Sequence, residues 1–453
     1  MATLAYVAEQ VRGELIGEDR RFDRVSTDTR SLRAGELFVA LRGPRFDGNA
    51  YVSQAHGRGA AGAVVDTVWP GELSQVRVSD TRLALGRLAE AWRMRFDIPV
   101  VAVTGSNGKT TVKEMLTRIL EGVGATLSTK GNLNNDIGVP LTLLNLRGAH
   151  RFAAIEMGAN HAGEIAYLTR LARPTVGIVN NAAAAHLEGF GSLSGVAKAK
   201  GELFAGLGES ATAVINADDH FAPLWRELAA RCKQVLTFGE SEDAEYRADS
   251  ISQEAESESP RLRFMLHTPR GSGTVRLNMI GRHNVLNALA AAAGASAAGV
   301  DLNAVIQGLE KAVNVTGRLT LKEGLRGARI IDDSYNANPS SLSSALDFLV
   351  QLQGRSWLVL GDMGELGGEA AAIHRDIGVD ARQLGVERLF TIGALAGSAA
   401  QAFGAGARSF EDTQSLIDAV RDELQPNVNV LVKASRKMRL EQVVSALTEE
   451  KGE

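Results

Sequence analysis

The segment 99–111 constrains the fold of this 453-residue chain more than any other. Its first half, Pro99-Val100-Val101-Ala102-Val103, is typical of a buried strand, and a glycine-rich turn and a helix from about Lys109 follow directly. The glycines Gly105 and Gly108 allow backbone N–H groups to turn towards phosphate oxygens, and the helix N-terminus adds favourable partial charge. A strand, a glycine-rich turn and a helix in this order predict a phosphate-binding loop.

The loop departs from the full phosphate-loop pattern, in which about four residues separate the glycines. Here two residues separate Gly105 from Gly108, and Val103 stands at the expected first glycine. The ending Gly-Lys-Thr-Thr agrees with the pattern, so we expect Lys109 to bind the β- and γ-phosphates and the Thr110 hydroxyl to bind Mg²⁺. Hydrolase, motor, kinase and ligase all remain open, whereas a GTPase is not expected because no Asn-Lys-x-Asp motif occurs.

Strand candidates alternate with helix candidates along most of the chain, which predicts an α/β fold with parallel sheets. The length predicts two or three domains. An amphipathic helix is expected at 83–95, and the helical stretch 284–313 precedes a last α/β block. The expected strands after the phosphate loop are 152–156, 176–180, 213–216, 329–332, 357–361, 389–393 and 428–433. The acidic tract 240–258 is expected to be a solvated hairpin or loop.

Composition narrows the class of protein. A net charge of -4 with no basic stripe makes nucleic acid an unexpected partner. Cys232 is the only cysteine and lies in no recognisable nucleophile motif, so a reducing compartment fits and a catalytic thiol is not expected. No apolar run approaches the ~20 residues of a membrane span, and the N-terminus does not resemble a signal peptide. We therefore expect a cytoplasmic protein that does not insert into membranes.

Polar residues gather at the ends of predicted strands, where open α/β sheets collect functional groups. Glu156 ends one strand and His186 follows another, and their oxygen and imidazole atoms are ligand types for divalent metals. The alternatives are that Glu156 caps a helix and that His186 binds a backbone group. Lys198 and Lys200 point in different directions on a helix, and the residues alone predict a solvated surface charge for each.

Several motifs resemble those of the Mur ligase family, in the family's order along nearly the whole chain. These are 104–110 (Thr-Gly-Ser-Asn-Gly-Lys-Thr), 131–140, 185–190, 27–30, 35–40, 332–339, 361–367 and 433–436. The branch most similar is the one that joins D-alanyl-D-alanine (D-Ala-D-Ala) to UDP-N-acetylmuramoyl-tripeptide (UDP-MurNAc-tripeptide). One departure is Ala434, where the family commonly has glycine.

The resemblance implies three domains: a small α/β domain for the UDP precursor (1–82), a central parallel-sheet ATPase domain (83–313) and a C-terminal Rossmann-like domain (314–453). It implies a monomer that forms an acyl phosphate from ATP and the precursor carboxylate, in cytoplasmic peptidoglycan precursor synthesis. A sister ligase for another amino acid, a P-loop ATPase without ligase activity and an inactive nucleotide-sugar binding module remain alternatives.

The resemblance also implies roles for individual residues. Lys109, Lys200, His186 and Glu156 are the implied catalytic residues. Two Mg²⁺ ions are implied, with Thr110, Glu156, His186 and a carbamylated Lys200 as ligands; Lys200 matches by its spacing to Phe204. The implied ATP contacts are Gly105, Ser106, Asn107, Gly108, Lys109, Thr110, Thr111, Asn284, Asn287, Arg318, Asp333, Tyr335 and Asn336. The implied substrate contacts are Asp28, Arg30, Phe46, Asp47, Gly48, Asn134, Asn135, Asp136, Asn338, Lys433 and Arg436.

Overall fold

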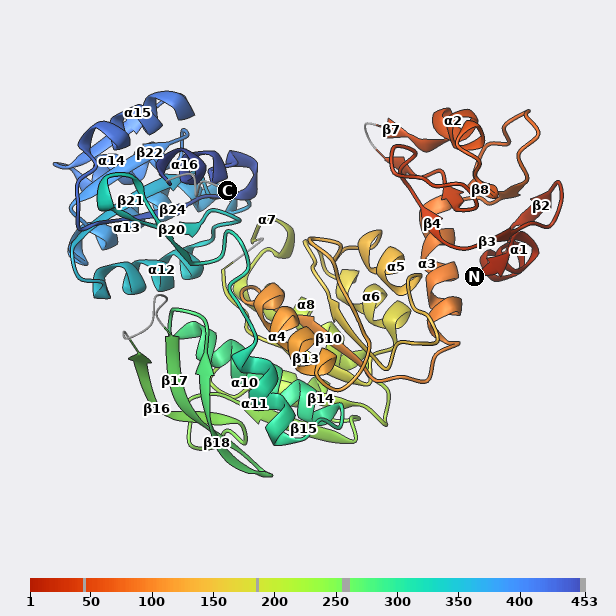
Figure 1. Ribbon diagram of the computed structural model, residues 1–453, viewed down its shortest axis with the longest axis horizontal. Coiled ribbons are helices and arrows are strands. Elements are labelled where there is room, and N and C mark those ends of the chain that lie inside the picture. Colours follow the sequence, from red (N-terminus) through yellow and green to blue (C-terminus); the bar gives the residue numbers. More distant parts are fainter. Residues whose placement is uncertain (44–45, 185–186, 255–260, 449–453) are drawn as a thin grey trace.

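The chain forms three α/β units, each built around its own main sheet (Figure 1). The computed structural model describes residues 1–43, 46–184, 187–254 and 261–448. In the view of Figure 1 the first unit (red) and the third unit (blue) lie on either side of the central unit. None of the helices in the described ranges is long and apolar enough to cross a membrane.

The first unit holds a mixed five-stranded sheet, in the order β2-β9-β8-β5-β4. Its elements are β1 (Ala2–Thr3), α1 (Leu4–Val11), β2 (Glu14–Ile16), β3 (Arg21–Phe22), β4 (Val25–Ser26), β5 (Leu37–Val39), β6 (Arg42–Gly43), β7 (Phe46–Asp47), η1 (Gly48–Tyr51), α2 (Val52–Gly57), β8 (Gly62–Val65) and β9 (Gln75–Arg77).

Helix α3 (Thr81–Arg93) joins the first unit to the central one and confirms the predicted amphipathic helix. Asp80 caps its start, because the Asp80 carboxylate accepts the N–H groups of Arg82 (2.8 Å) and Leu83 (2.9 Å). The buried residues Leu88 and Trp92 belong to one continuous core that also contains side chains of both units. This shared core ties the first unit to the central one.

The central unit is a six-stranded parallel sheet in the order β11-β12-β10-β13-β14-β15, with a three-stranded antiparallel sheet beside it. Its further elements are β10 (Val100–Thr104), α4 (Lys109–Glu121), β11 (Thr126–Ser128), α5 (Gly138–Leu143), β12 (Phe152–Glu156), α6 (Glu164–Ala172), β13 (Val176–Val179), α7 (Leu187–Phe190), α8 (Leu193–Ala205), β14 (Thr212–Asn216), α9 (Ala222–Leu228), β15 (Gln234–Phe238), β16 (Arg247–Glu254), β17 (Arg261–Thr268), β18 (Gly271–Leu277), α10 (His283–Ala297) and α11 (Leu302–Glu310).

Side chains of β10 alternate between two hydrophobic cores, as a strand buried on both faces requires. Val100 and Ala102 pack with α5, α6 and α8, whereas Val101 and Val103 pack with α4 and α10. Because β12 and β13 flank β10 in parallel, the carboxyl ends of the three strands meet at one edge of the sheet. This edge is where ligands bind in open α/β sheets.

The third unit is a second six-stranded sheet, in the order β19-β20-β24-β21-β22-β23, parallel except for β19. Its elements are β19 (Thr320–Glu323), η2 (Leu325–Gly327), β20 (Arg329–Asp333), α12 (Pro339–Gln351), β21 (Arg355–Gly361), η3 (Gly367–Glu369), α13 (Ala370–Gln383), β22 (Arg388–Ile392), α14 (Ala396–Phe403), β23 (Ala407–Phe410), α15 (Thr413–Glu423), β24 (Val428–Lys433), η4 (Arg436–Met438) and α16 (Glu441–Leu447). Each strand predicted from the sequence is present. The predicted α/β class is confirmed.

The described part of the acidic tract confirms the predicted solvated hairpin or loop. Residues 247–254 form β16, which pairs with β17 in an antiparallel hairpin, and residues 255–258 lie outside the described residues. The stretch predicted as helical from 284 to 313 divides into α10 and α11.

Candidate active site

The turn between β10 and α4 needs its glycines. Gly105 has φ +147° and Gly108 has φ +77°, conformations that residues with a Cβ rarely adopt. A Cβ on Gly108 would lie 2.3 Å from Asn287 Oδ1. The two-residue spacing therefore still gives a tight turn that only glycines allow and that brings the backbone close to Asn287.

The loop rests on the segment that follows β13. The Ser106 N–H donates to the Asn181 carbonyl (3.0 Å), and the Asn107 N–H donates to Asn181 Oδ1 (2.8 Å). The first N–H groups of α4, at Lys109 to Thr111, have no partner within the helix. Lys109, Thr110 and Thr111 line the cavity, so N–H groups of this helix start can donate hydrogen bonds to an anion bound there.

A chain of hydrogen-bonded, buried asparagine side chains packs against the phosphate loop. Asn180 Nδ2 donates to Asn287 Oδ1 (2.9 Å), and Asn287 Nδ2 donates to Asn284 Oδ1 (2.9 Å). Asn284 and Asn287, predicted as ATP contacts, both line the cavity but are only 4% exposed. Sequence reasoning assigned no role to Asn180, although its place directly after a strand was a signal.

Lys109 lies at the centre of the loop. Its Nζ donates to the carbonyls of Gly105 (2.7 Å) and Ser106 (3.2 Å). Burial lowers the pKa of Lys109 to about 8, Glu156 opposes this shift and Arg318 adds to it. Lys109 is thus a poorly hydrated cation, which a phosphate would stabilise.

The position of Lys200 differs from the one predicted from residue types alone. The default of a solvated surface charge is wrong, because Lys200 is 1% exposed on α8, whereas Lys198 is exposed. Its Nζ donates to the Ala159 carbonyl (3.4 Å) and lies 5.2 Å from the centroid of the Phe190 ring. Burial, with a smaller contribution from Lys109, lowers the pKa of Lys200 to about 7.

Glu156 fits a cation site. Its Oε1 accepts a hydrogen bond from Asn134 Nδ2 (2.7 Å), whereas its buried Oε2 has no hydrogen-bond partner among the residues that the structure describes. A buried carboxylate oxygen without a partner is costly unless a cation or donor reaches it. Within the described ranges no group of three His, Cys, Asp or Glu could hold a metal, and His186 lies outside the described residues.

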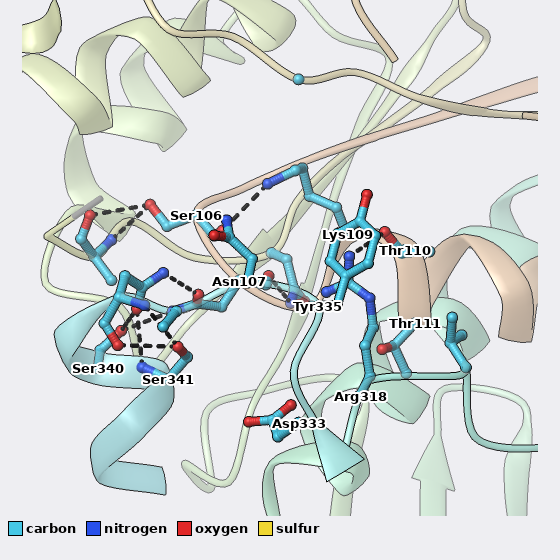
Figure 2. Close-up of a pocket in the computed structure, with 18 of the residues that line it drawn as sticks. Ser106, Asn107, Lys109, Thr110, Thr111, Arg318, Asp333, Tyr335, Ser340 and Ser341 are labelled. Atoms are coloured by element: carbon cyan, nitrogen blue, oxygen red, sulfur yellow. Dashed lines mark hydrogen bonds between the residues drawn. The ribbon is translucent and has the colours of Figure 1, made fainter. Parts of the chain in front are cut away.

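The third unit reaches the loop through Arg318, which lies just before β19. Arg318 Nη2 donates to Thr110 Oγ1 (3.0 Å), and its guanidinium lies 4.4 Å over the Tyr335 ring (Figure 2). Its Nε is buried, and no described residue offers it a hydrogen bond. Arg318 therefore holds a cationic group beside the hydroxyl that was predicted to bind Mg²⁺.

The rest of this wall comes from β20, β24 and the loops after them. Lys433 is 2% exposed, forms an ion pair with Asp333 and donates to the Asn336 carbonyl (3.1 Å). The neighbouring Ala434 has no positive φ, and a Cβ on Gly361 would lie 2.7 Å from its methyl group. The alanine thus causes no backbone strain, since Gly361 leaves room for it.

These residues surround one cavity of about 740 Å³ between the central and third units. The predicted residues that line it are Ser106, Asn107, Gly108, Lys109, Thr110, Thr111, Asn134, Asn135, Glu156, Asn284, Asn287, Arg318, Asp333, Tyr335, Asn336, Asn338, Lys433 and Arg436. Residues that sequence reasoning missed also line it: Asn160, Asn180, Asn181, His283, Ser340, Glu365 and Lys437. Gly105, Lys200 and Asp136 are not among its lining residues, and Asp136 forms an ion pair with Arg82.

The predicted contacts of the first unit do not line this cavity but form their own surface group. Asp28 pairs with Arg30 (2.7 Å), which lowers the pKa of Asp28 to about 2. The exposed rings of Phe46 and Tyr51 lie 6.0 Å apart, next to Asp47. Gly48 is buried, and a Cβ there would lie 2.6 Å from the carbonyl oxygen of the residue before β6.

The fold and the site define a phosphate-loop enzyme in which a second α/β unit covers the nucleotide end of a parallel sheet. The family model of the Mur ligase middle domain matches residues 103–295, and that of the Mur ligase, glutamate ligase domain, matches residues 317–436. The chain belongs to the Mur ligase family, which confirms the resemblance of its motifs.

Similarity extends over almost the whole chain. The UDP-N-acetylmuramoyl-tripeptide–D-alanyl-D-alanine ligase of Escherichia coli is 44% identical, over 99% of this chain and 98% of its own. The ligase of the same name from Bacillus subtilis is 34% identical, over 99% of this chain and 98% of its own. A crystal structure of MurF from Acinetobacter baumannii matches with a TM-score of 0.91 and 36% identity, over 98% of each chain. The structure of MurF from Thermotoga maritima in complex with ADP matches with a TM-score of 0.81 and 27% identity. The match covers 93% of this chain and 96% of that one.

Proposed function

We propose that this chain is an ATP-dependent peptide ligase that joins D-Ala-D-Ala to the carboxylate of UDP-MurNAc-tripeptide, in peptidoglycan precursor synthesis. The likeness to ligases of this name, 44% identity over nearly the full length, carries the proposal. A cavity that places a phosphate loop opposite a second α/β unit supports it, because ATP and an acceptor must meet between them.

We place ATP at the phosphate loop. The free N–H groups of the first turn of α4 and the Lys109 ammonium hold its phosphates. The Arg318 guanidinium and the Tyr335 ring cover them from the third unit, with Asp333 and Asn336 next to Tyr335. Asn284 and Asn287 stay predicted contacts on the adenine side, and their buried position agrees with a base held against α10.

We propose that two Mg²⁺ ions bind. Thr110 Oγ1 holds the first, and Glu156 Oε2 and Lys200 hold the second, with His186 as the further predicted ligand. Bound Mg²⁺ would neutralise negative charge on the phosphates and the attacking carboxylate. Lys200 fits this set only after carbamylation. Its neutral amine adds to CO₂, forming an N–C bond while one C=O electron pair moves to oxygen, and the nitrogen loses a proton. The product is an anionic carbamate, and a pKa of about 7 keeps much of the amine neutral at the pH of a cell.

The reaction proceeds in two steps. The tripeptide carboxylate attacks the γ-phosphorus, ADP leaves and an acyl phosphate forms. The dipeptide amine, after losing a proton, attacks the acyl carbon, and inorganic phosphate leaves. Both steps gather negative charge, so the contribution of the chain is positioning and electrostatic stabilisation by Lys109 and Arg318. Covering the cavity by the third unit keeps water from the acyl phosphate.

We assign the precursor to the first unit and the adjacent edge of the central unit, and the dipeptide to the third unit. We place the domain boundaries near residues 82 and 313, which fall between the last strand of one unit (β9, then β18) and the first strand of the next (β10, then β19). The precursor contacts are Asp28, Arg30, Phe46, Asp47, Gly48, Asn134, Asn135 and Asp136. The acceptor contacts are Asn338, Lys433 and Arg436. That the protein is a monomer stays a prediction, which sedimentation can test by measuring its mass in solution.

The decisive experiment measures phosphate release from ATP with UDP-MurNAc-tripeptide, with and without D-Ala-D-Ala. Release should require both, and mass spectrometry should find a product heavier by the dipeptide. Lys200→Met should abolish product, whereas Lys198→Met, on the exposed side of the same helix, should not. Release without the dipeptide, or only with another amino acid, would exclude the proposed function. A ¹³C carbamate signal that ¹³C-bicarbonate produces in the wild type and not in Lys200→Met tests the modification.

A further inference from the structure

One side chain of the phosphate loop turns away from the loop and towards the third unit. Asn107 Nδ2 donates to Ser340 Oγ (2.7 Å), and Asn107 Oδ1 accepts from Asn338 Nδ2 (2.7 Å). Ser340 Oγ donates in turn to Asn338 Oδ1 (3.2 Å). The three side chains therefore form a closed ring of hydrogen bonds, which Figure 2 shows from Asn107 to the start of α12.

The backbone of Asn107 is engaged on the opposite side. Its N–H donates to Asn181 Oδ1 (2.8 Å), and its carbonyl accepts from Asn180 Nδ2 (2.9 Å). Neither the N–H nor the side chain of Asn107 is available to a phosphate in this arrangement. The residue predicted as an ATP contact thus links the sheet of the central unit to the third unit.

The third-unit side of the ring is held by the capping box of α12. Asn338 is the N-cap of α12, and its Oδ1 accepts the Ser341 N–H (2.9 Å) while its own N–H donates to Ser341 Oγ (3.1 Å). Pro339 then begins the helix. The capping box fixes the Asn338 side chain at the start of α12. The hydrogen bond from Asn338 to Asn107 therefore forms only when the start of α12 lies against the phosphate loop.

A second contact holds the same loop three residues further on, where Arg318 donates to Thr110 Oγ1 (3.0 Å). Residues more than 200 positions away in the sequence thus reach both ends of the short segment 107–110. Separation of the third unit must break both contacts together.

We propose that Ser340 and Asn338 are positioning residues that act through Asn107, so that the third unit docks only on a correctly shaped phosphate loop. The ring then couples loop geometry to the covering of the cavity. The part of the test that measures amide formation rests on the proposed ligase function. The part that measures docking of the third unit does not. Loss of the Ser340 hydroxyl removes two of the ring's three hydrogen bonds and should lower the ratio of docked to separated molecules about fivefold.

The test is fluorescence energy transfer between dyes on the central and third units of the full-length chain. The background is Cys232→Ser, with Glu209→Cys and Asp376→Cys at exposed positions. Ser340→Ala should shift molecules to the separated state, and Ser340→Thr, which restores the hydroxyl, should reverse the shift. Ser343→Ala is the matched control, since Ser343 is exposed on the same helix. An equal response of Ser340→Ala and Ser343→Ala would overturn the inference.

A double-mutant cycle keeps the test independent of any single variant. Asn107→Ala and Ser340→Ala should be non-additive, because either change opens the same ring. Additive effects on the docked ratio would overturn the inference. In the ligase assay, Ser340→Ala should form less amide per phosphate released, which a merely structural change would not cause. Absence of amide with the wild type would reject the ligase function alone, while the docking result would still decide the inference.

Discussion

Replacing Lys200 by methionine should make the free energy of unfolding less dependent on pH. Lys200 is 1% exposed and donates one long hydrogen bond, of 3.4 Å, so its ammonium is poorly compensated for lost hydration. Burial lowers its pKa from 10.5 to about 7. Methionine has a similar length, carries no charge and leaves the apolar surroundings filled.

The magnitude follows from proton linkage. Between about pH 7 and pH 10.5 the unfolded chain keeps a proton that the folded chain has released, so folding becomes more favourable as pH rises. The difference between the two pKa values corresponds to about 5 kcal/mol in total. Between pH 7 and pH 9 the free energy of unfolding of the wild type should therefore rise by about 2 kcal/mol more than that of Lys200→Met.

The assay is urea denaturation of both proteins at several pH values, in buffer free of CO₂ so that Lys200 stays an amine. Lys198→Met provides the control, because Lys198 is exposed on the same helix and its loss should leave the pH dependence unchanged. Parallel curves for the wild type and Lys200→Met would refute the reasoning, since they would mean that Lys200 is protonated alike in both states.

Three further predictions concern the metal site, the cover of the loop and the packing of the central unit. Glu156→Gln keeps the bond from the neighbouring amide but removes the charge, so the Mg²⁺ concentration for half-maximal binding in calorimetry should rise at least about tenfold. Arg318→Lys keeps the charge but loses the planar fork that reaches Thr110, so the KM for ATP should rise about tenfold, and an unchanged KM would contradict that contact. Gly308→Ala would bring a Cβ to 2.4 Å from the backbone of α4 and should lower the free energy of unfolding by about 1–3 kcal/mol in urea, whereas Gly208→Ala, with nothing within 4 Å, should not.

Local patterns were enough to predict the elements that carry the phosphate loop. The apolar run before Gly105 was predicted as a buried strand and forms one, and the glycines predicted to shape the turn adopt positive φ. Glu156 was predicted at a strand end and lies there, with an oxygen left for a cation. These predictions succeeded because each depends on neighbours within a few residues.

The residue type predicted a solvated charge for Lys200 because lysines are usually exposed, but Lys200 lies four residues from both Val196 and Phe204, on the buried face of α8. That face is set by contacts with other helices: Trp225 on α9 donates to the Ala197 carbonyl of α8 (3.0 Å). Only the resemblance to a family placed Lys200 in the site.

The sequence by itself determined the α/β class, the order of strands and helices, the phosphate loop and, through its motifs, the family. Only the tertiary structure decided which side chains meet: Asn107 with Ser340, Arg318 with Thr110, and the chain of amides below the loop. The physical reason is that strand and helix formation follows from short-range periodicity and backbone preferences. Contacts across more than 200 residues depend instead on how whole sheets are positioned, which no local pattern encodes.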